Sequence, residues 1–371
     1  MSQYEIVKVT TKKELEKFIK FPFDLYKSDP YWVAPLIADQ KKFFDPRYNP
    51  YFEHSEVQLL LVLLSGKVCG CISAHTNNNH NSFHQDKKGF FGFFECINNS
   101  EVAKILLTEA EKWLREKDCN VMSGPYNFST NSECGLLIDG FDSPPFVMMT
   151  HNYPYYAALI EKAGYNKTMD LYAWLLTTHE MPAFLESVGK RFEKNKQFTI
   201  RCLNKKHLAE DIRTVFSIYQ KAWAPNWGFV PMSEKEFDHL VDSLLPIIDP
   251  ELVFIAECDG QPAGFSVALP NYNIILQKIK GKMNPLSIAK FLYYKNKMKS
   301  LRVITLGVIP EFLGKGIDTL FYYETWKTGL KKGFTTGEFS WVLETNTMMN
   351  KIARHLGATV HKTYRIYEKD I

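Results

Sequence analysis

Two pairs of short apolar runs, far apart in the chain, carry the clearest pattern of hydrophobic and polar positions. Residues 59–74 read LLLVLLSGKVCGCISA and residues 253–268 read VFIAECDGQPAGFSVA. In each stretch, two apolar runs flank a short segment that contains a glycine, Gly66-Lys67-Val68 in the first and Asp259-Gly260-Gln261 in the second. Two apolar runs joined by such a turn are typical of a β-hairpin. The pattern therefore predicts two similar hairpins.

The two hairpins belong to an internal repeat. Residues 6–15 (IVKVTTKKEL) align with 200–208 (IRCLNKKHL), and residues 29–36 (DPYWVAPL) align with 224–232 (APNWGFVPM) if one residue is inserted. The first match and the hairpin match share one offset, because residue 6 falls on residue 200 and residue 59 on residue 253. Three matches in the same order at nearly one offset predict two copies of one domain.

Each copy continues after its hairpin with the same order of elements. A strand, an amphipathic helix, a second strand, a helix that ends at a glycine and a last strand follow in both copies. The helix expected over 100–117 has Val102, Ile105, Leu106 and Trp113 on one side, which is the 3.6-residue period of an amphipathic helix. This order predicts an α/β (α+β) fold, a mixed sheet with helices on both faces, in each copy.

The repeat divides the chain into two expected domains. The first spans residues 1–180 and the second spans residues 198–371, with a linker helix over 181–197. The second copy also carries an insert, 284–301 (NPLSIAKFLYYKNKMKSL), with the pattern of an amphipathic basic helix. Such a helix is compatible with a solvated connection, with a lid over a site and with a contact to a membrane surface.

The stretch 306–326 (LGVIPEFLGKGIDTLFYYETW) joins a strand, a loop with two glycines and a helix in direct succession. Gly314 and Gly316 lack a Cβ, so an anion can approach the backbone amides of the loop closely. The first amides of a helix have no partner inside the helix, and the helix dipole adds positive charge there. The spacing is compatible with a tight turn and with a cradle for a phosphate.

The order of elements and this loop together resemble the GNAT (Gcn5-related N-acetyltransferase) family. In that family a strand leads into a Q/R-x-x-G-x-G/A loop at the start of a helix, and the loop amides hold the pyrophosphate of CoA. Residues 311–316 (EFLGKG) match both glycines but have Glu311 where the family has Gln or Arg. The resemblance covers both halves of the chain. It implies two tandem GNAT-like acyl-CoA N-acyltransferase domains, as in tandem-GNAT proteins whose acceptor is unknown.

The resemblance also implies how the second domain binds acetyl-CoA or another acyl-CoA. Backbone groups of the strand would contact the pantetheine, and the loop would hold the phosphates. An Asn after the next strand resembles the Asn that opens the family's fourth helix. The residues implied for the cofactor are Leu306, Gly307, Val308, Gly314, Lys315, Gly316, Ile317 and Asn346.

The first copy departs from the family at the same loop. Its strand ends in FFECI and is followed by NNSEVAKIL, without a glycine. Asn98, Asn99 or Ser100 is a good helix N-cap, and a side-chain cap takes the place that a phosphate needs. We therefore expect a degenerate first domain that does not bind CoA in the family's usual way and that shapes the substrate side.

Candidate catalytic residues come from the last strands of the second copy. In the family a Tyr of the fourth helix often protonates the leaving sulfur, but the helix here (NTMMNKIARHLG) has Ile352 or Ala353 at that position. Glu344 ends the strand 338–344, near where the acyl group should arrive, and is the candidate general base, with a capping or ion-paired Glu as the alternative. Tyr364 on the last strand is a candidate acid or hydrogen-bond donor, with packing as the alternative.

The aromatic segment NWGFVP of the second copy offers a candidate acceptor site. Asn226, Trp227 and Phe229 follow the first helix, where GNAT-like folds usually place the acceptor-binding loop. Because the motif recurs in the first copy, the alternative is that Trp32 and Trp227 are core anchors of both copies.

Composition and charge exclude several classes of protein. The chain has 371 residues, a net charge of +4 and no dense Lys/Arg block interleaved with aromatic residues, which argues against nucleic-acid binding. Its 7 cysteines are scattered without a C-x-x-C pair, which argues against a zinc site and a disulfide framework. The N-terminus lacks the apolar core of a signal peptide, and no run approaches the roughly 18 apolar residues of a membrane span. We expect a cytoplasmic protein, a monomer or homodimer, without metal or stable membrane insertion, that acts on a small-molecule or other acyl acceptor.

Two functions from different classes remain open at this point. The first is an acyl-CoA-dependent N-acyltransferase, with acetyl transfer as the expected case, that moves an acyl group from CoA to the amine of an unknown acceptor. The alternative is a non-catalytic acyl-CoA-binding or scaffold protein on a GNAT fold. The intact Gly-x-Gly favours the enzyme, whereas Glu311 and the missing Tyr favour the alternative. A fold that transfers aminoacyl groups, like the peptidoglycan-bridge enzymes, would need a basic tRNA-binding arm that the sequence lacks.

Overall fold

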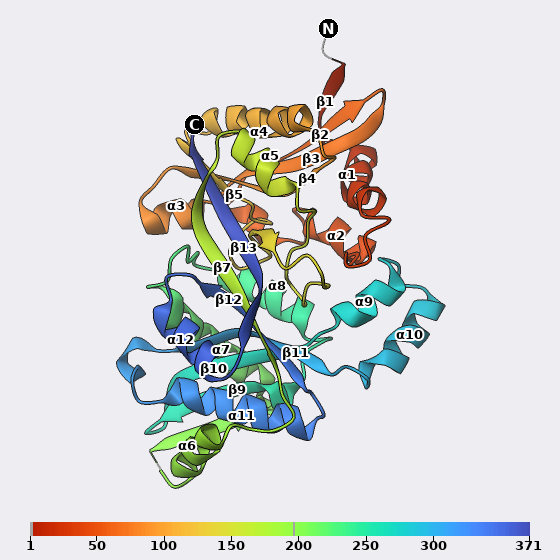
Figure 1. Cartoon of the computed structure of the whole chain (residues 1–371). Coiled ribbons are helices and arrows are strands. Elements are labelled where there is room, and N and C mark those ends of the chain that lie inside the picture. Colours follow the sequence, from red (N-terminus) through yellow and green to blue (C-terminus); the bar gives the residue numbers. More distant parts are fainter. Residues whose placement is uncertain (1–2, 196) are drawn as a thin grey trace. The chain divides into compact units, whose positions relative to one another are not determined.

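The computed structural model describes residues 3–195 and 197–371 (Figure 1). The helices are α1 (Lys12–Leu25), α2 (Ile37–Phe43), α3 (Asn78–His84), α4 (Ser100–Arg115), α5 (Tyr156–Lys162), α6 (Ala183–Glu193), α7 (Leu208–Trp223), α8 (Glu234–Leu244), α9 (Asn273–Ile279), α10 (Pro285–Lys295), α11 (Ile317–Lys331) and α12 (Thr347–His355). The strands are β1 (Tyr4–Lys8), β2 (Val57–Leu64), β3 (Lys67–Thr76), β4 (Lys88–Cys96), β5 (Val121–Gly124), β6 (Leu136–Asp139), β7 (Asn166–Thr177), β8 (Phe198–Cys202), β9 (Val253–Cys258), β10 (Gln261–Pro270), β11 (Ser300–Val308), β12 (Thr336–Leu343) and β13 (Thr359–Asp370). No helix among these described residues is long and apolar enough to cross a membrane.

The chain forms two compact units, each assembled from separate stretches of sequence. Unit 1 consists of Met1–Leu171, Asn273–Tyr293 and Lys362–Ile371. Unit 2 consists of Tyr172–Tyr272 and Tyr294–His361. The boundaries expected near residues 180 and 198 follow the sequence repeat, whereas the compact units divide the chain within β7, after β10, within α10 and within β13.

The sheets explain why the repeat and the compact units differ. In unit 1 the strand order is β1-β2-β3-β4-β5-β13, and in unit 2 it is β7-β12-β11-β10-β9-β8. The last strand of the second copy, β13, pairs with β5 of the first copy, with Tyr367 opposite Gly124. The last strand of the first copy, β7, borders β12. Unit 1 contains the parallel pair β4 and β5, and unit 2 contains the parallel pair β11 and β12. The mixed α/β sheet expected from the sequence is confirmed.

Both expected hairpins are present. The turn between β2 and β3 is Ser65-Gly66, with φ of 50° and 77°, and the turn between β9 and β10 is Asp259-Gly260, with φ of 52° and 76°. Positive φ at both central residues is the signature of a two-residue type I′ turn, which matches the twist of antiparallel strands. The repeat therefore extends to the backbone conformation of the turns.

Strand β2 shows why its sequence is continuously apolar. Leu60 and Val62 pack in one buried cluster with α4, whereas Leu61 and Leu63 pack in another with α1. The strand is thus covered on both faces, which requires apolar residues at every position rather than at alternate ones. Burial of each such side chain contributes roughly 1.5–3 kcal/mol.

The segment expected as a linker helix contains α6. Its Leu185 is fully buried in a cluster with Tyr323 and Trp326 of α11. Gly189 lets the two helices approach, because a Cβ there would lie 2.3 Å from the ring of Tyr323. The helix is present as expected, and it forms part of the core of unit 2.

Candidate active site

The two glycines of the expected phosphate loop stand at the start of α11 with positive φ, 76° for Gly314 and 82° for Gly316. Gly316 is the N-cap of α11, and no side chain among the described residues caps the helix there. A Cβ on Gly314 would meet no atom within 4 Å, so the space beside the loop is open. A Cβ on Gly316 would lie 2.9 Å from Phe192. Open amides at a helix N-terminus fit an anionic group such as the phosphates of CoA.

The corresponding helix of the first copy, α4, has a different start. Oδ1 of Asn99 accepts hydrogen bonds from the backbone N–H groups of Glu101 at 2.9 Å and Val102 at 3.3 Å. The side-chain cap expected from the sequence is therefore confirmed. The amides that a phosphate would need are already bonded.

Leu306, Gly307 and Val308 lie at the end of β11, where it parts from β12. The ladder between these parallel strands covers only Ser300–Val303 and Thr336–Phe339. On its other side β11 continues to pair with β10 as far as Val308. The edge of β11 that faces away from β10 is thus outside the ladder, as binding of a pantetheine by backbone groups would require.

The candidate catalytic residues of the second copy lie in different units. Glu344 follows β12 in a turn of unit 2, and its backbone carbonyl accepts a hydrogen bond from Nδ2 of Asn350 at 3.3 Å. Tyr364 is fully buried in β13 and belongs to unit 1. Asn346 opens α12, with Oδ1 accepting from the N–H of Met349 at 3.1 Å. The chemical roles of these residues stay predictions.

A buried polar network occupies the neighbouring part of β12. Glu338 Oε1 accepts from Ser340 Oγ at 2.6 Å, and Glu338 Oε2 lies 2.7 Å from His361 Nε2. Arg302 Nε donates to Ser340 Oγ at 2.7 Å. Because the Glu338 carboxylate is buried and paired on both oxygens, it is suited to holding β11, β12 and β13 together.

The expected acceptor segment has one buried and two accessible residues. Phe229 is buried against Tyr219, with ring centroids 5.8 Å apart, whereas Asn226 is exposed and Trp227 is partly exposed. In the first copy Trp32 stacks on Tyr26 at 5.3 Å and lines a pocket. Neither Trp is fully buried, and both are intermediate in exposure. An acceptor role for residues 226–229 stays a prediction.

Unit 1 contains a pocket of about 340 Å³ at the place where β4 parts from β5. The ladder of these strands covers only Lys88–Phe90 and Val121–Ser123. The pocket is lined mostly by apolar side chains from α1, β4 and the loops near residues 33 and 147, among them Phe18, Ile19, Trp32, Phe44, Phe94 and Met149. Its size lies within the range of about 300–1,000 Å³ that is usual for small-molecule sites.

A β-bulge shapes β4 at this pocket. Cys71 pairs with Glu95 and Ser73 with Gly92, so Phe93 and Phe94 together oppose one residue of β3. Phe93 has a φ of 46°, and its N–H donates to Oδ1 of Asn127 at 2.9 Å. Bulges of this kind re-aim side chains beside functional sites.

Glu95 is one of two carboxyl groups that line the pocket, together with Glu133. Its Oε2 accepts hydrogen bonds from Tyr26 Oη at 2.7 Å and Tyr156 Oη at 2.6 Å. Burial raises the pKa of Glu95 to about 7, although the two hydroxyls oppose the shift. The side chain retains contact with solvent through the pocket. Because both protonation states are populated near neutral pH, Glu95 is suited to donate or accept a proton.

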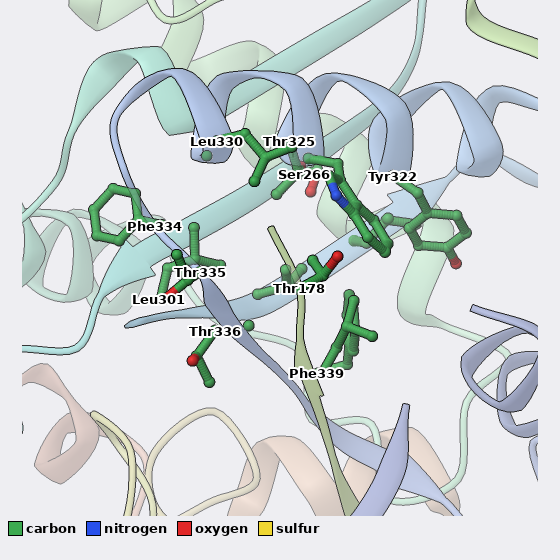
Figure 2. A pocket seen from close by; sticks show the side chains of 16 residues that line it. Thr178, Ser266, Leu301, Tyr322, Thr325, Leu330, Phe334, Thr335, Thr336 and Phe339 are labelled. Atoms are coloured by element: carbon green, nitrogen blue, oxygen red, sulfur yellow. The ribbon is translucent and has the colours of Figure 1, made fainter. Parts of the chain in front are cut away.

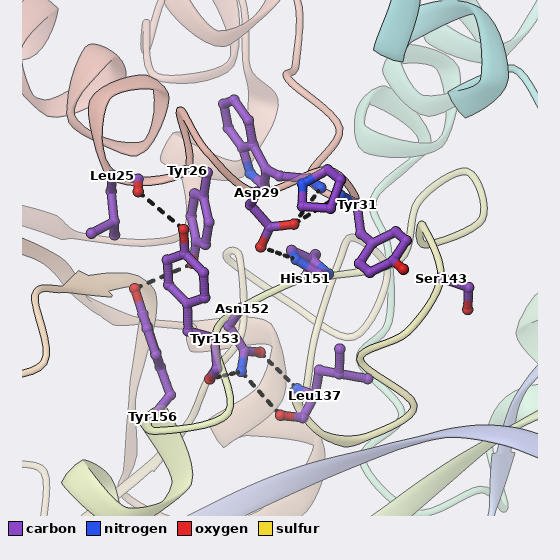
Figure 3. A network of polar contacts seen from close by, with 12 residues as sticks. Leu25, Tyr26, Asp29, Tyr31, Leu137, Ser143, His151, Asn152, Tyr153 and Tyr156 are labelled. Atoms are coloured by element: carbon purple, nitrogen blue, oxygen red, sulfur yellow. Dashed lines mark hydrogen bonds and ion pairs between the residues drawn. The ribbon is translucent and has the colours of Figure 1, made fainter.

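His151 lines the same pocket and forms a hydrogen-bonded pair with Asp29 (Figure 3). His151 Nε2 lies 2.9 Å from Asp29 Oδ2, and Asp29 Oδ1 accepts from the N–H of Tyr31 at 2.8 Å. Burial lowers the pKa of His151 below its usual range, while the hydrogen bond to Asp29 opposes the shift. Among the described residues, Nδ1 of His151 has no hydrogen-bond partner. Nδ1 of His151 is enclosed by the protein, and the imidazole is oriented through Nε2 by the Asp29 carboxylate. A neutral imidazole oriented by a carboxylate in this way can act as a general base.

Cys71 lies beside Glu95 in the pocket wall. Burial and the neighbouring carboxyl raise the pKa of the Cys71 thiol well above its usual range. The thiolate is the nucleophilic form of cysteine, so Cys71 is poorly suited to form an acyl-enzyme.

Unit 2 has a smaller cavity between α11 and the strands, of about 60 Å³, lined by residues such as Tyr322, Trp326 and Phe339 (Figure 2). This volume is far below that of a usual small-molecule site. Within residues 3–195 and 197–371, no group of three His, Cys, Asp or Glu side chains is placed to hold a metal ion.

Comparison with known proteins gives two relatives that match over nearly the whole chain. The Bacterial ceramide synthase of Caulobacter vibrioides is 36% identical over 372 residues, which cover 98% of this chain and 97% of the relative. Protein YghO of Escherichia coli K12 is 35% identical over 367 residues, which cover 97% and 94% of the two chains. The chain belongs to the family of these two proteins. No family model matches it.

Solved structures show that this family has the tandem GNAT fold. A tandem GNAT protein from the clavulanic acid biosynthesis pathway covers 99% of this chain and 98% of its own, with a TM-score of 0.59 and 12% identity. A GCN5-related N-acetyltransferase from Sphaerobacter thermophilus covers 100% and 96%, with a TM-score of 0.56 and 13% identity. The GNAT resemblance and the fold class expected from the sequence are confirmed.

Sequence reasoning missed Glu95, His151 and Asp29. Glu95 had a signal, because it is the only charged residue in the strand GFFGFFECI and a lone acid in an apolar strand is a candidate for a shifted pKa. Asp29 is the first residue of the repeated segment DPYWVAPL, in which the repeat points only to the aromatic residues as candidates. His151 is a single histidine in a loop, and only the tertiary structure pairs it with Asp29.

Proposed function

We propose that the protein is an N-acyltransferase that moves a fatty-acyl group from CoA to the amine of a long-chain amino alcohol. The full-length similarity to a bacterial ceramide synthase supports this substrate class, because a ceramide is the amide of a fatty acid and a long-chain amino alcohol. The tandem GNAT fold supports the reaction type. The acyl group proposed here is thus longer than the acetyl group expected from the sequence.

The observation that carries the proposal is the pocket of unit 1. Its lining is mainly apolar, as alkyl chains require, and its polar groups include the half-buried side chain of Glu95 and the buried side chain of His151. The pKa of each group is moved away from its ordinary value, up to about 7 for the Glu95 carboxyl and down for the His151 imidazole. Such a separation assigns an acid and a base to one site.

The two groups take complementary roles in amide formation. Neutral His151 accepts at Nδ1 the proton that the amine loses as it attacks the thioester carbonyl. Asp29 acts as a positioning residue that fixes the imidazole through Nε2. Protonated Glu95 supplies a proton to the leaving thiolate, and Tyr26 and Tyr156 hold its carboxyl group in place. The C–S bond breaks, the C–N bond forms, and the proton count of the enzyme and products balances.

CoA itself fits the start of α11. The amides of the loop at residues 314–317 would hold its phosphates, with the exposed Lys315 as an added positive charge, and CoA would supply the activated acyl thioester. This assignment is independent of the pocket of unit 1 and is tested separately.

The function is tested by mass-spectrometric detection of amide product. The purified full chain is incubated with acetyl-, octanoyl- or palmitoyl-CoA and with sphinganine or ethanolamine. We expect amide from sphinganine with a long acyl chain and little or none from ethanolamine or acetyl-CoA. Binding of acyl-CoA without any amide would favour the non-catalytic alternative. Equal transfer to ethanolamine would contradict the long-chain acceptor.

A further inference from the structure

Helix α10 (Pro285–Lys295) has an inverted pattern of burial. Leu286 and Leu292 are each 65% exposed, and Ile288 is 50% exposed, whereas the residue that α10 buries is the polar Ser287. Met283, just before the helix, is also exposed. A surface helix of a protein in water normally turns its apolar stripe to the core. A cluster of exposed apolar side chains of this kind marks a surface that binds a partner.

One hydrogen bond joins the segment before α10 to α2 of unit 1, and two more hold α10 to that segment. The N–H of Ile37 donates to the carbonyl of Gly281 at 3.1 Å. Ser287 Oγ donates to the carbonyl of Lys282 at 2.7 Å, and Lys290 Nζ donates to the carbonyl of Lys278 at 3.0 Å. The exposed apolar side chains therefore belong to a helix that hydrogen bonds hold in place. Figure 1 labels this helix, α10, and the preceding helix, α9.

The charge around this helix has a single sign. The segment 273–299 contains Lys278, Lys280, Lys282, Lys290, Lys295, Lys297 and Lys299. No Asp or Glu occurs between Asp259 and Glu311. Lysines beside exposed apolar side chains are typical of a helix that lies in the interface of an anionic membrane. The positive charge favours a negatively charged partner. The exposed apolar side chains favour a partner with an accessible hydrocarbon layer, such as a lipid bilayer.

Helix α9, which precedes α10, borders the pocket of unit 1. Leu276 and Asn273 of α9 line that pocket, and Asn273 Nδ2 donates to the carbonyl of Pro145 at 2.8 Å. The exposed helix and the pocket thus share one short segment of chain.

We propose that α10 and the lysines of the segment 273–299 bind the surface of an anionic phospholipid bilayer. Ile288 and Leu292, which lie about one turn apart on the same side of α10, enter the headgroup layer, and Lys278, Lys280 and Lys282 contact lipid phosphates. The helix lies in the interface and does not span the bilayer. Of the three roles that the sequence left open for the insert, this is the membrane-surface contact. The proposal rests on α10 and these lysines, and it holds whether or not the protein transfers acyl groups.

Sedimentation with vesicles tests the proposal on the full chain. The probes are vesicles of phosphatidylcholine alone and vesicles of phosphatidylcholine with phosphatidylglycerol, without any acyl-CoA or amine. We expect binding to the anionic vesicles that weakens with added salt. The variants Ile288→Ser/Leu292→Ser and Lys278→Gln/Lys280→Gln/Lys282→Gln should each bind about tenfold or more weakly. All changed side chains are exposed, and the thermal midpoint verifies folding.

Matched variants elsewhere control for charge and exposed apolar area. Lys12→Gln/Lys13→Gln/Lys17→Gln removes three exposed lysines from α1, and Met348→Ser removes an apolar side chain that is 68% exposed. Both should bind like the parent. Absence of parent binding to anionic vesicles, or equal loss in the control variants, would overturn the proposal. So would self-association of the parent through α10, detected by light scattering, without vesicle binding.

Discussion

Glu95 and Gly307 occupy the same position in the two copies of the domain. Glu95 pairs with Cys71 of the first hairpin, and Gly307 pairs with Phe265 of the second. Cys71 and Phe265 are themselves equivalent, since both stand in the fifth position after the glycine of a type I′ turn, 194 positions apart in the sequence.

The two copies have therefore kept different parts of the site. At the first, Glu95 receives hydrogen bonds from two tyrosines and faces a pocket. At the second, a Cβ on Gly307 would lie 1.8 Å from the ring of Trp223, so this indole covers the position. The open loop of Gly314 and Gly316 occurs only in the second copy, whereas Asn99 caps the helix of the first. The pocket with titratable groups thus belongs to the first copy, and the open glycine loop belongs to the second.

The contact between Gly307 and Trp223 predicts a strong coupling. Gly307→Ala should lower the stability by about 1–3 kcal/mol or more, because a rigid indole cannot move aside easily. In a Trp223→Ala background the same change should cost much less, and urea unfolding of the four proteins gives the coupling. Gly337→Ala is the control, since its Cβ would meet Leu301 at an ordinary 3.7 Å. Equal costs of Gly307→Ala in both backgrounds would show that Trp223 does not fill the site.

The raised pKa of Glu95 predicts a pH-dependent stability. Below the ordinary glutamate pKa of 4.5 both the folded and unfolded chains carry the proton, and between 4.5 and about 7 only the folded chain retains it. The parent therefore loses stability as the pH rises through this window, by at most about 3 kcal/mol. Glu95→Gln stays neutral, so its stability relative to the parent should increase from pH 4.5 to 8. Thermal midpoints across this range test it, and the exposed Glu116→Gln should show no such trend.

The open loop at α11 predicts where CoA binds. Gly314→Glu should weaken CoA binding at least about tenfold, because a carboxylate would face the phosphates. Gly260→Glu is a matched control, since both glycines have a φ of 76° and neither Cβ would meet an atom within 4 Å. Calorimetric titration with CoA compares the two variants. Equal affinities would remove the loop from the CoA site.

The pairing of Asp29 with His151 predicts a shift in the pH–rate profile. Asp29 raises the pKa of His151 against the effect of burial, so Asp29→Asn should lower that pKa further. The rate should rise with pH through the pKa of His151, because the neutral imidazole is the base. In Asp29→Asn the acidic limb of kcat/KM should move to lower pH while the plateau falls by about 10²-fold or more. A lower plateau with an unmoved limb would mean that Asp29 is only structural.

The sequence predicts most of the fold because repeats and hairpins leave local signals. The two turns, the Asn99 cap and the helix with Gly314 and Gly316 follow from residues close together in the chain. The exchange of β7 and β13 leaves no such signal, because each strand pairs with residues far away in the sequence, such as Tyr367 with Gly124. The pair of His151 and Asp29 joins residues 122 positions apart, which no single sequence reveals. The glycine loop predicts a base nearby in the second copy, such as Glu344, whereas the pocket with shifted pKa values lies in the copy without that loop.

The most direct test of the account is the rate of amide formation from palmitoyl-CoA and sphinganine by His151→Asn under single-turnover conditions. An asparagine at this position retains a polar side chain but cannot act as a base at neutral pH. The account predicts a fall of about 10²–10⁴-fold relative to the parent, with the thermal midpoint and the CoA affinity unchanged. A parental rate in His151→Asn would contradict the assignment of the chemistry to the pocket of unit 1.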